Sequence, residues 1–131
     1  PAPPNVRVYG HLGRADYEAL FKNADVAIGS LGLHVLSMDE ACPLKVREYL
    51  AYGIPVIIGY RDTDFPNGAP FLLQLPNAPD NVEKNLDQIK EFVYKWKGRR
   101  VSRSAIVHLD VQHKEAQRLG FMRSLLGGCA R

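Results

Sequence analysis

The stretch from Pro43 to Gly59 restricts the fold more than any other part of the chain, because it predicts a helix followed directly by a buried strand. Pro43 suits a helix start, since its φ is fixed and its missing N–H needs no partner there. Gly53 stands where a left-handed C-cap belongs. The apolar residues between them recur at helical spacing: Leu44, Val46, Tyr49 and Leu50. The run Ile54–Gly59 is apolar and β-branched, which is typical of a parallel strand buried on both faces.

Two glutamates flank the start of this helix. Glu40 lies in the loop before it and Glu48 lies inside it, with seven residues between them. The first turn of a helix has free N–H groups, here those of Leu44, Lys45 and Val46, and such groups bind phosphate readily. A ligand with hydroxyls at both ends and a phosphate in the middle, such as a nucleotide sugar, would fit this layout. Two glutamates on an amphipathic helix are also commonly no more than solvated charges.

The order of these residues resembles a known family. Glu40-ACPLKVR-Glu48 followed by AYGIPVI is similar to the E-x7-E motif and the next strand of retaining GT-B glycosyltransferases of the family 4-like group. The wider run from ADVAIG to RDTD resembles a bacterial subset with the pattern PLKVREYLA-x-G-x-P. The resemblance covers roughly Val6 to Trp96 and concerns the carboxyl-terminal, donor-binding domain. It implies hexose transfer from a UDP- or GDP-sugar with retention, in polysaccharide biosynthesis, with no cofactor besides the donor and no protein-bound metal.

The resemblance also implies a role for each matched residue. Glu48 would bind the ribose hydroxyls, and Glu40, as the catalytic residue, would bind a hydroxyl of the donor sugar. The amides of Leu44 and Lys45 would receive the distal phosphate. The Lys45 side chain would add a positive charge there or face solvent.

The loop after the second expected strand supplies a wall for this pocket. Ser30 and Gly32 lie in it, and ligands of open α/β sheets bind at the carboxyl ends of the strands. His34 lies in the same loop, where a solvated histidine is the simpler interpretation.

Elsewhere the chain alternates short apolar runs with amphipathic helices, which predicts an α/β fold: a Rossmann-like parallel sheet with flanking helices. The expected strands are Val6–Tyr9, Asp25–Gly29, Ile54–Gly59 and Phe71–Leu75. The expected further helices are Asp16–Ala24, Val82–Lys97, Ser102–Leu109 and a last one from Asp110 to Leu126 with a double-glycine stop. Its expected core face consists of Leu119, Met122, Leu125 and Leu126. We divide the chain into a partial donor-binding domain (1–98) and a basic helical segment (99–131).

The resembled domain has two further strands before the first one found here, and an acceptor-binding domain precedes it. We therefore expect a chain truncated on its amino-terminal side, with part of the phosphate clamp missing and little catalysis on its own. The strand at Val6–Tyr9 would lack its usual neighbour. We expect it to be disordered or to mediate self-association through an exposed sheet edge.

Charge and cysteine usage narrow the partners and the compartment. Residues 1–97 have a net charge of −2 and residues 98–131 one of +5. The basic tail suits an acidic partner or a membrane surface, but it lacks the interleaved aromatic residues of a nucleic-acid site. Two cysteines make no disulfide framework, and we expect a cytoplasmic protein with peripheral membrane contact as an alternative. Asp62 and Asp64 are weak evidence for a cation site, and Cys42 has no neighbouring histidine in the sequence to support a nucleophile.

Three functions remain open at this point. The first is the donor-binding half of a glycosyltransferase. The second is a non-catalytic nucleotide-binding or oligomeric module that keeps the helix without the chemistry. The third is an interaction protein that uses its basic carboxyl-terminal helix.

Overall fold

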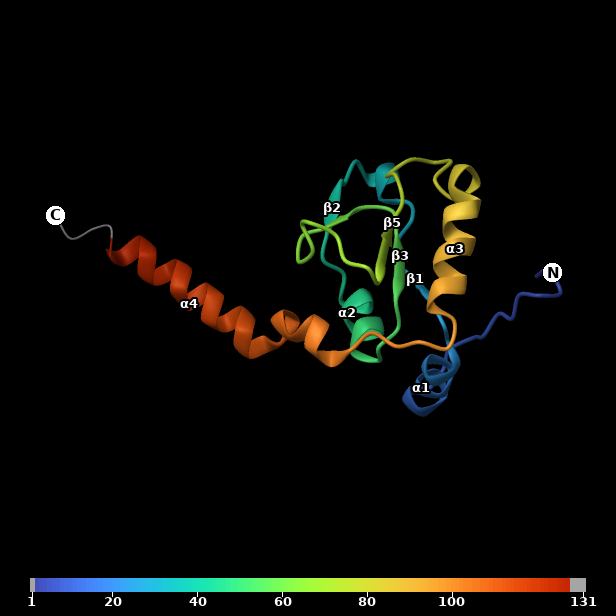
Figure 1. The fold of residues 1–131 in the computed structure, drawn as a ribbon, viewed down its shortest axis with the longest axis horizontal. Coiled ribbons are helices and arrows are strands. Elements are labelled where there is room, and N and C mark those ends of the chain that lie inside the picture. The colour runs from blue at the N-terminus through green and yellow to red at the C-terminus, as the bar shows by residue number, and fades with distance from the viewer. Residues whose placement is uncertain (1, 128–131) are drawn as a thin grey trace.

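The computed structural model describes residues 2–127 and has an α/β architecture (Figure 1). In chain order its elements are α1 (Arg14–Asn23), β1 (Ala27–Ile28), the 3₁₀ helix η1 (Leu33–Leu36), β2 (Glu40–Ala41), α2 (Leu44–Ala51), β3 (Val56–Ile58), β4 (Arg61–Asp62), β5 (Leu72–Gln74), the 3₁₀ helix η2 (Glu83–Asn85), α3 (Leu86–Trp96), the 3₁₀ helix η3 (Arg103–Leu109) and α4 (Val111–Gly127). No helix in the described part of the chain is both long enough and apolar enough to cross a membrane.

The strands form two small parallel sheets. The larger one has the order β1-β3-β5, with Ile57 of β3 in register with Ile28 on one side and Leu73 on the other. The smaller one pairs β2 with β4. All three residues of the central strand β3 are buried, as the apolar run predicted. The predicted parallel α/β fold is thus confirmed for three of the four expected strands.

The boundaries of α2 follow from the two residues that marked them in the sequence. Pro43 is extended (φ −70°, ψ 137°) and occupies the N-cap position, so that α2 begins at Leu44, one residue later than we expected. Gly53 has a φ of 73° and ends it. The Gly53 N–H donates to the Leu50 carbonyl and the Ile54 N–H donates to the Tyr49 carbonyl, both at 2.9 Å, which is the Schellman arrangement. This turn leads the chain directly into β3.

The core lies on both faces of the larger sheet, because successive β3 side chains point in opposite directions. On one face Val56 and Ile58 pack against Val46 and Leu50 of α2. On the other face Ile57 packs with Phe92 of α3, with Leu73 of β5 and with Leu75, which directly follows β5. Truncating a residue as buried as Leu50, which is 1% exposed, would cost about 2–5 kcal/mol. The two helices therefore fix the sheet from both sides.

The predicted first strand, Val6–Tyr9, is wrong for the single chain. This segment is irregular and exposed, with Val8 80% exposed. Its trace runs away from the sheet toward the amino terminus (Figure 1). A strand forms only where a neighbour accepts its hydrogen bonds, and the described residues provide none beside this segment.

The expected core face of the last helix is also wrong. In α4 no residue is buried, and the side chains expected to pack are exposed: Leu119 (52%), Met122 (58%), Leu125 (62%) and Leu126 (76%). The helix projects away from the body of the molecule (Figure 1), so that only its start is near the core. Val101, just before η3, and Ile106, within η3, are buried in the core instead. The second glycine of the predicted stop lies outside the described residues.

Candidate functional site

Three loops meet just beyond the carboxyl end of β3. The Gly59 N–H donates to the Ser30 carbonyl at 2.9 Å, which places the loop after β1 beside the end of β3. The Arg61 N–H donates to the Asp39 carbonyl at 2.9 Å, which places the segment before α2 there as well. Parallel α/β sheets bind ligands at this edge. The candidate site is therefore formed by these loops and by the amino terminus of α2.

Two glycines permit this close packing. A Cβ on Gly29 would lie 2.9 Å from a methyl group of Ile58, and one on Gly59 would lie 3.0 Å from the Leu31 Cα. Asn81, which is 4% exposed, donates to the Leu31 carbonyl at 2.8 Å and holds the loop from the other side. The loop after β1 is thus fixed in place by backbone and side-chain contacts.

The amino terminus of α2 offers two backbone donors. The N–H groups of Val46 and Arg47 both donate to the Pro43 carbonyl, at 3.2 and 3.4 Å. The expectation that Val46 has a free N–H is therefore wrong. The amides of Leu44 and Lys45 have no hydrogen bond within residues 2–127, and both side chains are exposed. Two donors next to an exposed lysine are what an incoming anion would meet.

The two glutamates of the motif are on the surface near this helix start. Glu40, in β2, is paired in register with Arg61 of β4 and forms an ion pair with it. Its side chain is 44% exposed. Glu48, in the second turn of α2, is exposed. No hydrogen bond joins Glu40 to Glu48 in the described structure, so that a ligand, not a direct contact, would have to connect them.

The residues expected to form the pocket wall lie next to this region. Ser30 is half-buried and uses its carbonyl to hold Gly59, whereas Gly32 is exposed before η1. His34, in η1, is half-buried, and its Nδ1 is enclosed without a hydrogen-bond partner among the described residues. The interpretation of His34 as a fully solvated loop residue is therefore wrong.

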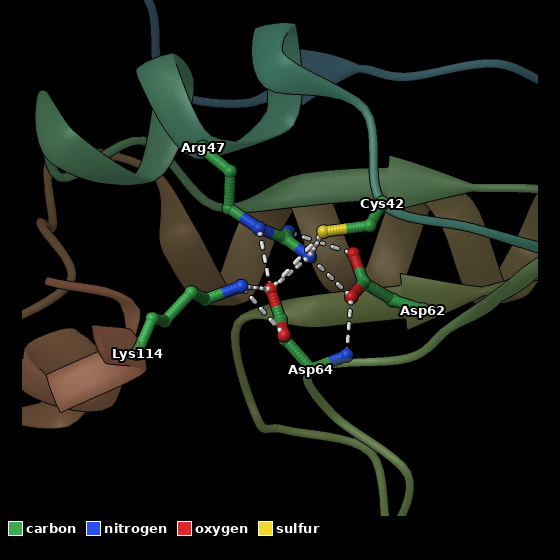
Figure 2. A network of polar contacts seen from close by, with 5 residues as sticks. All are labelled: Cys42, Arg47, Asp62, Asp64 and Lys114. Carbon is green, nitrogen blue, oxygen red and sulfur yellow. Dashed lines mark hydrogen bonds and ion pairs between the residues drawn. The ribbon is translucent and has the colours of Figure 1, made fainter. Parts of the chain in front are cut away.

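A polar network beneath α2 joins five side chains (Figure 2), of which the sequence pattern singled out the cysteine and the two aspartates but neither of the two cations. Arg47 forms a bidentate pair with Asp62, which is 1% exposed, with its Nη1 2.8 Å from Asp62 Oδ2. Its Nε donates to Asp64 at 3.0 Å, and its Nη2 lies 3.0 Å from the Cys42 sulfur. Lys114, at the start of α4, donates to both oxygens of Asp64 at 2.7 and 2.8 Å.

The ionisation of this network follows from its pairing. Burial opposes the charge on Arg47, but the hydrogen bonds and charge of Asp62 outweigh it and raise the pKa of the guanidinium. Burial likewise opposes the charge on Asp64, but Lys114, Cys42 and Arg47 together lower the pKa of that carboxyl to about 2. Charged partners shift a pKa in this way because they stabilise the ionised form. The Arg47 guanidinium and the Asp64 carboxylate are therefore both ionised at neutral pH.

Tyr60 is buried beside this network. Its side chain is 1% exposed, and its hydroxyl has no hydrogen-bond partner within the described residues. Burial, followed by the negative charge of Asp62, raises the pKa of the phenol. The hydroxyl therefore stays protonated at neutral pH.

The same network decides how Cys42, Asp62 and Asp64 should be interpreted. One ligand atom from each lies within 4.8 Å of the others, a spacing that suits a metal ion. However, the Arg47 guanidinium already donates to all three, and Lys114 neutralises Asp64. A metal ion would have to displace two side-chain cations. The network instead ties the loop before α2 to β4 and to α4, and it thereby fixes the amino terminus of α2.

A signal for this network exists in the sequence. Arg47 is adjacent to Val46 and three residues from Leu50, the two buried positions of α2, so that a charge at this point needs a partner. Asp62 and Asp64 follow the most apolar strand of the chain and are the nearest acidic candidates. The packing of Arg47 over the Phe65 ring, 5.6 Å from its centroid, has no such signal.

Comparison of the chain with models of protein families, with curated proteins and with solved structures found no match.

Proposed function

We propose that this chain is the donor-binding half of a retaining GT-B glycosyltransferase and that it binds a nucleotide sugar at the amino terminus of α2. The observation that carries this proposal is the placement of Glu40 and Glu48. Both are exposed, they flank two unbonded helix amides, and they lie beside the carboxyl end of a parallel strand. Each part is common alone, but together they give the layout that a nucleotide sugar would fit, with hydroxyls at both ends and a phosphate in the middle.

The amides of Leu44 and Lys45 would receive the distal phosphate. They point out of the helix start, where the partial positive charge of the helix dipole favours an anion. When the sugar leaves, negative charge develops on this phosphate, and donors already in position stabilise it without reorganisation. The exposed ammonium of Lys45 would add to the field.

The two glutamates would fix the ends of the donor. Glu48 is exposed and would accept hydrogen bonds from the two ribose hydroxyls. Glu40 would accept a hydrogen bond from a hydroxyl of the sugar, and its ion pair with Arg61 positions the carboxylate. Ser30 and Gly32 would close the side of the pocket. Arg47 does not contact the donor in this scheme but holds the helix start through Asp62.

The second candidate, a nucleotide-binding module without chemistry, would use the same residues, and turnover separates it from the first. The third candidate, an interaction protein, is favoured by one observation: α4 has no buried residue and exposes leucines beside basic side chains. If that were the whole function, the chain would not need a nucleotide site.

Titration calorimetry with nucleoside diphosphates and their sugar derivatives tests the proposal directly. We expect binding of at least one nucleotide, and tighter or equal binding of its sugar derivative. A chain that is folded by circular dichroism and binds none of the panel would refute the proposal. Turnover assays with the bound donors then separate a transferase from a binding module.

A further inference from the structure

Strand β1 forms an open edge of the larger sheet. The Ala27 N–H donates to the carbonyl of Pro55, just before β3, at 2.9 Å. The Gly29 N–H donates to the carbonyl of Ile57, in β3, at 2.8 Å. Since backbone groups alternate in direction along a strand, those of Val26 and Ile28 point to the open side. No hydrogen bond within residues 2–127 uses them on that side. An edge of this kind is a template for another strand.

Apolar surface lies next to this edge. A groove of about 370 Å³ runs along α3, lined by Asp25, Ile89, Lys90, Val93, Tyr94 and Lys97. Val26 packs on the α3 side of the sheet, and Ile28, two residues later, lies on the same face and is 59% exposed. In Figure 1, α3 stands beside β1. The helix thus presents apolar side chains that the three-stranded sheet does not cover.

The segment Val6–Tyr9 is a strand-forming sequence without a strand partner. Valines alternate with Arg7 and Tyr9, and both valines are exposed, Val6 by 47% and Val8 by 80%. Apart from a bond between the Val6 N–H and the Pro3 carbonyl, no backbone hydrogen bond of this segment is found in the described structure. One chain therefore carries both an unpaired edge and an unpaired segment that suits it.

We propose that two copies of the chain exchange these segments, so that Val6–Tyr9 of each copy adds a strand to the β1 edge of the other. The two valines share one face of the added strand and would cover the groove along α3. The exchange is reciprocal and closes into a two-fold dimer with two identical contacts. The strand predicted at this segment would then form in the dimer, although the single chain lacks it.

Two observations favour a second copy and the β1 edge. In the single chain the segment runs away from the sheet (Figure 1), so that its own β1 stays open. The opposite edge of the sheet, at β5, offers less: the groove there is about 150 Å³, and Leu73 is only 9% exposed. The proposal does not depend on nucleotide binding.

Analytical ultracentrifugation of the whole chain over a range of concentrations tests this dimer. Val8→Lys removes the apolar contact of the segment and brings an ammonium next to Lys90 and Lys97. We expect it to weaken the dimer about tenfold or more, because the ammonium replaces the apolar contact of Val8 with the groove and two of the three charged residues that line the groove repel it. Val111→Lys is the matched control, since Val111 is 75% exposed on α4, and it should leave the dimer unchanged. Ile28→Lys tests the edge side and should act like Val8→Lys.

Hydrogen exchange identifies the segment itself. The amides of Val6–Tyr9 should be protected in the wild-type dimer and exchange freely in Val8→Lys. A monomer at every concentration would overturn the proposal, whether these amides are open or are protected by the chain's own β1. A dimer that Val8→Lys and Ile28→Lys weaken no more than Val111→Lys does would also overturn it, because its interface would lie elsewhere.

Discussion

Replacement of Asp64 by asparagine gives the sharpest test of the polar network beneath α2. Asp64 accepts hydrogen bonds from Lys114 at 2.7 and 2.8 Å and from the Arg47 Nε at 3.0 Å, and its side chain is 18% exposed. Its pKa is lowered from an ordinary 3.8 to about 2. At 1.36 kcal/mol per pKa unit, this shift corresponds to roughly 2 kcal/mol of folding free energy.

The direction of the pH dependence follows from that shift. Because the pKa in the folded chain lies below the unfolded value, the contribution is complete above about pH 5 and is lost as the pH falls toward about 2. Asp64→Asn should therefore lower the free energy of unfolding by about 2 kcal/mol at pH 7, and its difference from wild type should shrink as the pH falls.

Urea unfolding followed by circular dichroism between neutral and acidic pH measures this difference. Asp87→Asn is the control, because Asp87 is fully exposed and its nearest cation, Lys90, is 3.7 Å away. It should change the free energy of unfolding by less than about 0.5 kcal/mol at any pH. A cost for Asp64→Asn that stays constant between pH 5 and strong acid, or that matches the control, would refute the electrostatic account of the network.

The other predictions concern the core and the helix faces. Arg47→Met should cost about 3–5 kcal/mol in urea unfolding, because it leaves the buried Asp62 unpaired; a cost below about 1 kcal/mol would contradict this. Gly29→Ala should cost about 1–3 kcal/mol, since its methyl group would meet another at 2.9 Å. Gly32→Ala, with open space around it, should cost much less, and equal thermal midpoints for the two variants would contradict the packing argument. Leu126→Gln should change stability by less than about 0.5 kcal/mol, and a larger loss would indicate that α4 packs after all.

The central part of the fold could be predicted because its signals are local. A proline and a glycine bound α2, and a run of β-branched residues forms β3. Each signal acts through the backbone of its own residues, so that no knowledge of neighbours was needed.

The elements that failed depend on neighbours that the sequence does not specify. Val6–Tyr9 has strand-forming residues, but pairing needs an edge within reach. Leu119, Met122, Leu125 and Leu126 have helical spacing, which predicts a face but not what the face contacts. In α4 nothing among the described residues covers that face, and η3 fills the core in its place.

The polar network beneath α2 could be predicted only in part, because it too depends on residues that are distant in the sequence. The spacing of Asp62 and Asp64 is weak evidence for a bound cation. The cation turned out to be Arg47, from an earlier helix, joined by Lys114, which is fifty residues after Asp64. Contacts over such a separation depend on how α2, β4 and α4 are placed in space. A sequence pattern alone does not encode that placement.

The donor-site account depends most directly on Glu48. Calorimetry should compare wild type, Glu48→Gln and Glu40→Gln, with Glu91→Gln on the exposed side of α3 as a matched control. A charge-assisted hydrogen bond is worth roughly 1.5–3 kcal/mol, so that Glu48→Gln should weaken the binding of a nucleoside diphosphate about tenfold or more. Glu40→Gln should bind the nucleoside diphosphate normally and weaken only its sugar derivative, and Glu91→Gln should change neither. If Glu48→Gln binds every nucleotide as tightly as wild type and Glu91→Gln do, the ribose assignment is wrong and the donor site is not at α2.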